Sequence, residues 1–149
     1  MDTRTDSKIR LLLRILRFPL TSLLVLYVSL VHLMNEGETL VGVASIAIVF
    51  GPMLAAPYMV TRRLWMSIGL HIAWNYTMGK IFSGAVSGGN EMQGLFKTTF
   101  AGPQLLTGGS AGMEGSLIAI LVSAAASVIL LILAVRRGKI VPPSWKRRA

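Results

Sequence analysis

Three long apolar segments without a charged residue constrain this chain more than any other feature. They are Leu40 to Val60, Leu64 to Gly79 and Ser116 to Val135. A helix needs about 20 apolar residues to cross roughly 30 Å of hydrocarbon, so each segment reaches or approaches the length of a transmembrane helix. A fourth apolar segment, Leu20 to Met34, is shorter, and it follows a basic, helix-compatible stretch from Lys8 to Phe18. We predict an all-α integral membrane bundle of about four transmembrane helices, preceded by a basic amphipathic helix.

The composition agrees with a membrane protein. Hydrophobic residues make up 53% of the chain and charged residues 14%, which is too apolar for an ordinary soluble domain. The net charge of +9 comes from short basic groups between the apolar segments, so we expect a lipid bilayer and no nucleic acid as partner. The chain has no cysteine, which excludes disulfides, thiolate metal sites and a cysteine nucleophile.

The basic residues predict the orientation, because Lys and Arg near the ends of spans stay on the cytoplasmic side. A four-span arrangement assigns all but two of the 15 lysines and arginines to one side, and Glu36, Glu38, Glu91 and Glu114 to the other side or near it. Both termini are therefore expected in the cytoplasm. We predict a single membrane domain over residues 1–149, with a basic segment (1–18), a transmembrane bundle (20–135) and a basic tail (136–149).

A glycine-rich connection from Phe82 to Gly115 precedes the last predicted helix. Connections of this length are usually functional or mobile. Apolar side chains within it, such as Phe96 and Leu105, favour a segment that folds back onto the bilayer or into the bundle.

Few strongly polar side chains interrupt the apolar segments, and such groups are site candidates because they are expensive to hold in a membrane. His71 and Asn75 lie four residues apart, so on a helix they share one face. His32 lies near the end of the first apolar segment. The same side chains could instead form hydrogen bonds between helices and hold the bundle together.

Other prominent residues have simpler interpretations. Trp65, Trp74 and Tyr76 are expected to pack or to anchor the helix at the membrane interface. Glu114, just before the last segment, is interpreted as an acid that favours a helix N-terminus.

The stretch from Leu64 to Tyr76, with His71 and Asn75, resembles the HxxxN motif of the CPBP family, the CAAX-protease and bacteriocin-processing (Abi-type) intramembrane metalloproteases. Upstream, Val28 to His32 is similar to the family's FxxxH motif, with valine in place of phenylalanine. The runs at 85–88, 102–109 and 113–116 are also similar to the segment that follows in bacterial members. The resemblance covers roughly residues 10–120 and corresponds to the C-terminal half of the family domain.

The family's first motif, EExxxR, is not present. The corresponding place holds Asp6 and Arg10, an acid and an arginine at matching spacing, without the double glutamate. The resemblance makes Asp6 and Arg10 candidate catalytic residues beside His32, His71 and Asn75. Because the glutamate pair is missing, we expect a truncated or degenerate enzyme with weak or absent proteolysis.

The resemblance implies an intramembrane metalloendopeptidase that cleaves membrane-associated peptides or proteins. It also implies a metal ion, expected to be Zn²⁺, held by His32, His71 and Asn75, since neutral imidazole is a usual zinc ligand. His71 and Asn75 would either bind the metal or donate hydrogen bonds to the oxyanion.

Two other functions compete with this one. The chain could be a non-enzymatic membrane scaffold, immunity or partner-binding protein in which the His and Asn pair serves helix packing, and the missing EExxxR motif favours this alternative. A four-span small-molecule exporter is disfavoured, because such transporters usually place an acid deep in a span and these segments contain none. Substrate and oligomeric state are open at this point.

Overall fold

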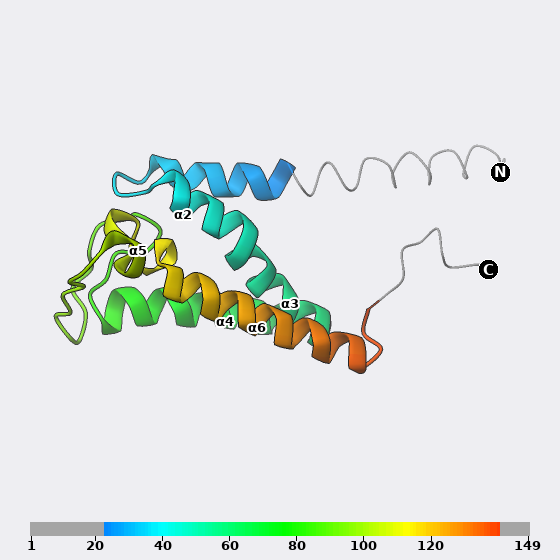
Figure 1. The fold of residues 1–149 in the computed structure, drawn as a ribbon. Coiled ribbons are helices and arrows are strands. Elements are labelled where there is room, and N and C mark those ends of the chain that lie inside the picture. Colours follow the sequence, from blue (N-terminus) through cyan, green and yellow to red (C-terminus); the bar gives the residue numbers. More distant parts are fainter. Residues whose placement is uncertain (1–22, 141–149) are drawn as a thin grey trace, which may run out of the picture.

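A computed structural model describes residues 23–140 of the chain (Figure 1). Within these residues every regular element is a helix, as the sequence predicts. The basic segment at residues 1–18, with Asp6 and Arg10, lies outside the described residues, as does most of the basic tail.

The helices follow one another with short connections except between η3 and α5. Their bounds are Leu23–Met34, which ends in η1 (His32–Met34); α2 (Leu40–Ser45), η2 (Ile46–Phe50) and α3 (Gly51–Thr61); α4 (Leu64–Tyr76) and η3 (Thr77–Ile81); α5 (Gln104–Thr107), η4 (Gly109–Ala111) and η5 (Met113–Gly115); and α6 (Leu117–Arg136).

Elements α2, η2 and α3 form one continuous helix, Leu40–Thr61. Thr39 begins it, since its side chain accepts a hydrogen bond from the amide of Gly42 at 3.0 Å. The middle turn, η2, is a wider π-helical turn. Pro52 lies two residues after it, and a proline ring clashes with the carbonyl four residues earlier, here Ile48, and has no N–H to donate. A wider turn relieves this clash. The helix ends where Arg62 adopts a left-handed conformation with φ 59°.

The last helix, α6, starts at a similar cap. The Ser116 side chain accepts a hydrogen bond from the amide of Ala119 at 3.1 Å. Small buried residues at a spacing of four, Ala119, Ser123 and Ser127, lie on one face of α6. Small side chains let helix backbones approach closely, and α6 packs against α3.

Two described helices, Leu40–Thr61 and Leu117–Arg136, are long and apolar enough to cross a membrane. The first helix, Leu23–Met34, is apolar but shorter. Elements α4 and η3 form a helix over the predicted segment Leu64 to Gly79. This helix carries the polar residues His71, Asn75 and Lys80, and it is not one of the two long, apolar helices. The membrane bundle is therefore supported, while the number of four spans stays a prediction.

A small core joins the long helices. Phe50, Met53 and Ala119 are buried together, and Leu70 and Trp74 of α4 pack against them. The rings of Phe50 and Trp74 meet edge to face, with centroids 5.2 Å apart. Large apolar side chains on the outside of the bundle remain exposed, as a lipid-facing surface requires.

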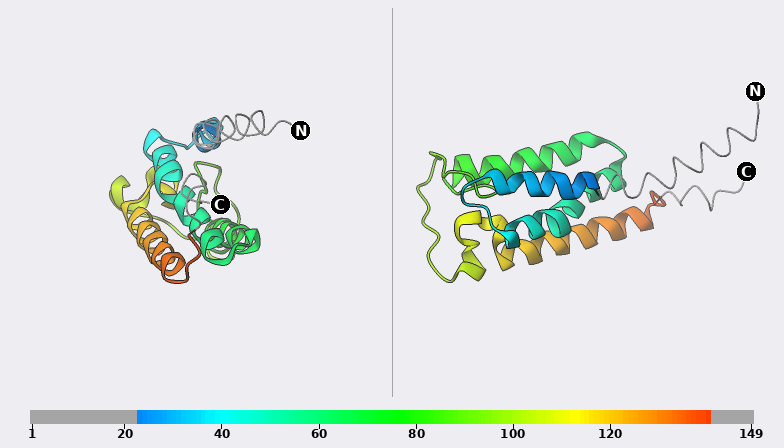
Figure 2. Two further views of the ribbon diagram at one scale, coloured as in Figure 1. Left: turned by 90° about the vertical axis from the view of Figure 1, so that its right-hand side faces the viewer. Right: turned by 90° about the horizontal axis from the view of Figure 1, so that it is seen from above.

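Different segments of the chain meet at the two ends of the bundle (Figures 1 and 2). At one end, the Arg62 guanidinium donates a hydrogen bond to the carbonyl of Lys139, so the turn after α3 lies beside the end of α6. At the other end, the connection before α6 meets the turn after the first helix. The amide of Gly37 donates to the carbonyl of Gly88 at 2.9 Å, and the amide of Gly88 donates to the carbonyl of Ala111 at 3.0 Å. The glycine-rich connection therefore folds onto the bundle, as predicted.

Candidate functional site

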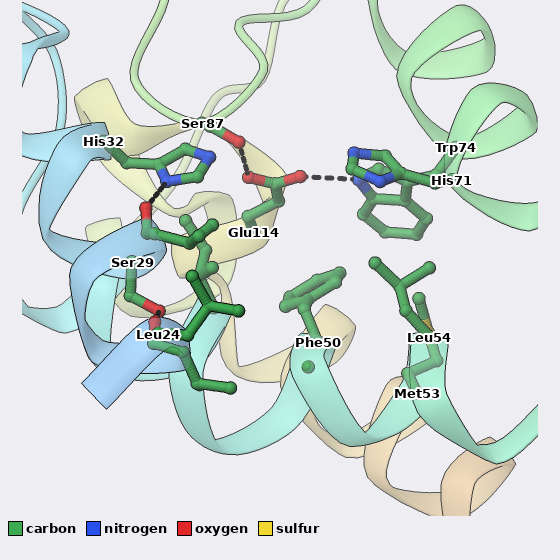
Figure 3. A pocket seen from close by; sticks show the side chains of 14 residues that line it. Leu24, Ser29, His32, Phe50, Met53, Leu54, His71, Trp74, Ser87 and Glu114 are labelled. Atoms are coloured by element: carbon green, nitrogen blue, oxygen red, sulfur yellow. Dashed lines mark hydrogen bonds between the residues drawn. The ribbon is translucent and has the colours of Figure 1, made fainter. Parts of the chain in front are cut away.

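A cavity of about 280 Å³ lies between the first helix, the η2 and α3 region, and α4. Most of its wall is apolar and includes Leu24, Phe50 and Met53. Both histidines of the chain, His32 and His71, line it (Figure 3). The sequence predicts that these two residues act together, and the fold brings them to one cavity.

His32 is held by its own helix at the end of the cavity. Its Nδ1 lies 2.8 Å from the carbonyl oxygen of Val28, one turn earlier. A carbonyl can only accept a hydrogen bond, so Nδ1 donates this one and Nε2 is the ring nitrogen left for other contacts. In Figure 3 that second nitrogen faces the side of the cavity where Ser87 and Glu114 lie.

The opposite wall belongs to α4, where His71 and Trp74 lie three residues apart and both line the cavity. Trp74 is positioned by its ring contact with Phe50. Asn75 belongs to the same helix and is half-buried, but it is not among the residues that line this cavity. The predicted pair is thus divided, since His71 borders the cavity with His32 and Asn75 does not.

Glu114 completes the polar end of the cavity, and the sequence interpretation missed it. Its side chain is 6% exposed, and it accepts a hydrogen bond from the Trp74 indole Nε1 at 2.8 Å and a second from the Ser87 hydroxyl. Ser116, not Glu114, caps α6. Glu114 does lie in the first turn of η5, just before α6, as the sequence interpretation expects, and these contacts add a place in the cavity wall. Its position in a glycine-rich stretch next to a buried helix start was the one available signal.

The turn from Val86 to Gly89 presents the Ser87 hydroxyl to Glu114. Ser87 and Gly88 both have positive φ, 48° and 66°, and the amide of Gly89 donates to the carbonyl of Val86 at 2.9 Å. Asn35, just after the first helix, donates from its side chain to the carbonyl of Ser87 at 2.6 Å. A non-glycine residue with positive φ is often found at functional sites, where neighbouring contacts hold it in place.

A second acid, Glu38, lies near this polar end, in the connection outside the helices. The pKa of its carboxyl is raised above the ordinary value, mainly because burial disfavours the charged form. The nearby Glu114 also raises this pKa, while the hydrogen bond from the Thr39 amide and the nearby His32 lower it. One oxygen accepts from the amide of Thr39 at 2.8 Å, and the other, Oε2, is buried without a hydrogen-bond partner. Gly42 leaves room for this carboxyl, because a Cβ there would lie 1.9 Å from Oε1.

The predicted zinc ligands do not form a complete site in the described part of the chain. Among residues 23–140, no three His, Cys, Asp or Glu side chains gather closely enough to hold a metal ion. Protein zinc sites use three or four protein ligands, whereas His32 and His71 supply two and Asn75 lies outside the cavity. The residues present therefore do not fit a zinc ion by themselves.

Comparison with known proteins gives a match to one family model. The family model described as type II CAAX prenyl endopeptidase Rce1-like matches residues 10–77. The match starts where the predicted resemblance starts and includes His32, His71 and Asn75, while the similarity predicted after residue 77 lies outside it. A search of curated proteins and a search of solved structures found no match. Over residues 10–77, a little under half of its length, the chain is therefore similar to the Rce1-like CAAX prenyl endopeptidase family, in agreement with its motifs.

Proposed function

We propose that this chain is a membrane-embedded endopeptidase that cleaves membrane-associated peptides or proteins in the cavity between the first helix and α4. The observation that carries this proposal is that His32 and His71, far apart in sequence, line the same cavity. The family match over residues 10–77 supports protease-like chemistry there.

The side chains suit the hydrolysis of a peptide bond in a partly apolar setting. The apolar wall favours an extended, apolar peptide segment, and the polar end offers groups for a water molecule and a carbonyl oxygen. The unprotonated Nε2 of His32 accepts a hydrogen bond from water, and His71 donates to the developing oxyanion. Asn75 would assist by the resemblance, from the same helix as His71. A zinc ion would need a third ligand from elsewhere in the chain, so the proposed chemistry uses side chains alone.

The polar end of the cavity lies at the end of the bundle where the glycine-rich connection meets the turn after the first helix. The charged residues at the opposite end predict how the bundle is oriented in a membrane. We place the turn at Arg62 and Arg63 and the end of α6 on the cytoplasmic side, because both carry positive charge and Arg62 contacts Lys139. The connection from Phe82 to Gly115 then lies on the opposite side, in a multi-pass protein with both termini in the cytoplasm.

The test uses the full chain purified in detergent and a membrane-anchored peptide with a fluorescent reporter. We expect slow cleavage by the wild type and loss of cleavage in His32→Ala and His71→Ala, with circular dichroism spectra unchanged. A matched control is Thr77→Ala, an exposed position on the helical continuation of α4 that does not line the cavity. Equal cleavage by wild type and His71→Ala would refute the proposed site.

A non-enzymatic scaffold or partner-binding role is the second candidate. It is favoured by the hydrogen bonds at the polar end, since both oxygens of Glu114 and the Nδ1 of His32 are bonded within the chain itself. Under this alternative the polar residues stabilise the bundle. His71→Ala would then lower the melting temperature in detergent, and no metal-dependent or metal-independent cleavage would be found.

A further inference from the structure

We propose that Glu114 is the general base of the cavity, the group that takes a proton from the attacking water. This inference rests on the proposed peptide hydrolysis and extends it to a residue outside the matched family region, which ends at residue 77. It gives the described part of the chain its own carboxylate, independent of Asp6.

Position is the first argument. Among residues 23–140, Glu114 is the one carboxylate that lines the cavity shared by His32 and His71. In Figure 3 the carboxylate lies between His32 on one side and His71 with Trp74 on the other. A water molecule or a peptide carbonyl that contacts both histidines would therefore also approach Glu114.

Rigidity is the second argument, because a general base must be held in position by its neighbours. Glu114 is fixed by donors from two different elements, the Trp74 indole on α4 and the Ser87 hydroxyl in the turn after η3. Each carboxylate oxygen has two lone-pair directions, so one hydrogen bond per oxygen leaves room for water. The positive φ of Ser87 indicates that the chain accepts local strain to present this hydroxyl.

The proposed step balances without a co-reactant. The water oxygen forms a bond to the carbonyl carbon while one of its protons passes to the Glu114 carboxylate. The resulting oxyanion accepts a hydrogen bond from His71. The carbon–nitrogen bond then breaks, and the proton on Glu114 passes to the leaving nitrogen, which restores the carboxylate. His32 positions the water through Nε2.

The deciding variant is Glu114→Gln, measured with the membrane-anchored peptide in the full chain. Glutamine can keep both neighbours, since its amide oxygen accepts from Trp74 and its amide nitrogen can donate to the Ser87 oxygen. We expect kcat to fall by roughly 100-fold or more, with KM and melting temperature close to wild type, because general-base groups contribute about 10²–10⁴ in rate. Glu91→Gln, at an exposed acid in the same connection, is the matched control and should behave as wild type.

The outcomes separate this inference from the proposed function. If the wild type and Glu114→Gln cleave at equal rates while His71→Ala does not, the hydrolase stands and the base is wrongly assigned. If Asp6→Asn abolishes cleavage and Glu114→Gln does not, Asp6 is the base. If Glu114→Gln fails to fold, Glu114→Asp replaces it, and an unchanged cleavage rate in that variant would overturn the assignment. A wild type without cleavage refutes both proposals.

Discussion

The indole nitrogen of Trp74 donates a hydrogen bond to the carboxylate of Glu114 at 2.8 Å, and this contact joins α4 to η5, the short helix just before α6. Both residues line the cavity that holds the two histidines. The contact explains why Trp74 faces inward, although tryptophans in membrane helices often anchor at the interface. It also makes the polar end of the cavity part of the packing between helices.

Trp74→Phe should therefore destabilise the bundle more than the smaller ring alone would suggest. Phenylalanine keeps the contact with Phe50 but removes the N–H, which leaves a buried carboxylate oxygen without its donor. We expect a loss of about 1–3 kcal/mol, measured by thermal unfolding in detergent. Trp65→Phe is the control, because Trp65 is 78% exposed and should tolerate the change. Equal melting temperatures for the two variants would contradict the role of this hydrogen bond.

Gly88 allows the turn after η3 to approach the connection after the first helix. A Cβ on Gly88 would lie 2.3 Å from the amide nitrogen of Glu38, and its φ is +66°. Gly88→Ala should thus destabilise the loop end of the bundle and increase its sensitivity to proteolysis. Gly138→Ala is a close control, with φ +62° and open space around its Cβ, so it carries only the left-handed backbone cost of about 1–2 kcal/mol. If both variants lose the same stability, the contact with Glu38 is unimportant.

Much of the helical framework could be predicted from the sequence, because the ends of the apolar segments carry local signals. The predicted helices that begin at Leu40 and Ser116 start within one residue of the observed ones, where Thr39 and Ser116 act as caps. Arg62 likewise ends α3 where the charge pattern ends the apolar segment. The wide turns η2 and η3 were not predicted, since they depend on backbone packing that apolar periodicity does not report.

The candidate site was only partly predictable for a related reason. His32 and His71 are recognisable from motifs within helices, where spacing fixes the direction of a side chain. Glu114 follows a long glycine-rich connection, and its place in the cavity depends on turns at Ser87, Gly108 and Gly112 with positive φ. No local pattern links these turns to α4, so the contact with Trp74 appears only in the folded chain. Asp6 and Arg10 lie outside the described residues, and their roles stay predictions.

Glu38 should make the stability of the bundle depend on pH. Its pKa is raised above the ordinary value of 4.5, mainly because burial disfavours the charged form. The folded protein then binds a proton more tightly than the unfolded chain, so this contribution is fully present below the ordinary pKa. It is lost as pH rises through the raised pKa of the folded state.

Glu38→Gln tests this dependence by replacing the carboxyl with a neutral group of the same shape. We expect the melting temperature of the wild type to fall over the window that starts near pH 4.5 and extends upward, and that of Glu38→Gln to change less. At neutral pH the variant should be at least as stable as the wild type. Glu36→Gln, at an exposed acid nearby, should leave the pH dependence as it is. A wild-type curve that rises over this window would show that the sign is wrong.

The absence of cysteine makes the membrane arrangement directly testable, because any introduced thiol is the only one in the chain. Two exposed positions at opposite ends of the bundle are Asn90, in the long connection, and Lys139, beyond α6. The proposed arrangement predicts that Lys139→Cys reacts with a membrane-impermeant maleimide only from the cytoplasmic face of sealed vesicles. Asn90→Cys should react only from the opposite face, because the Leu117–Arg136 helix lies between the two positions and is long enough to cross the membrane. Labelling of both thiols from one face would mean that α6 does not span, and the charge-based orientation would be wrong.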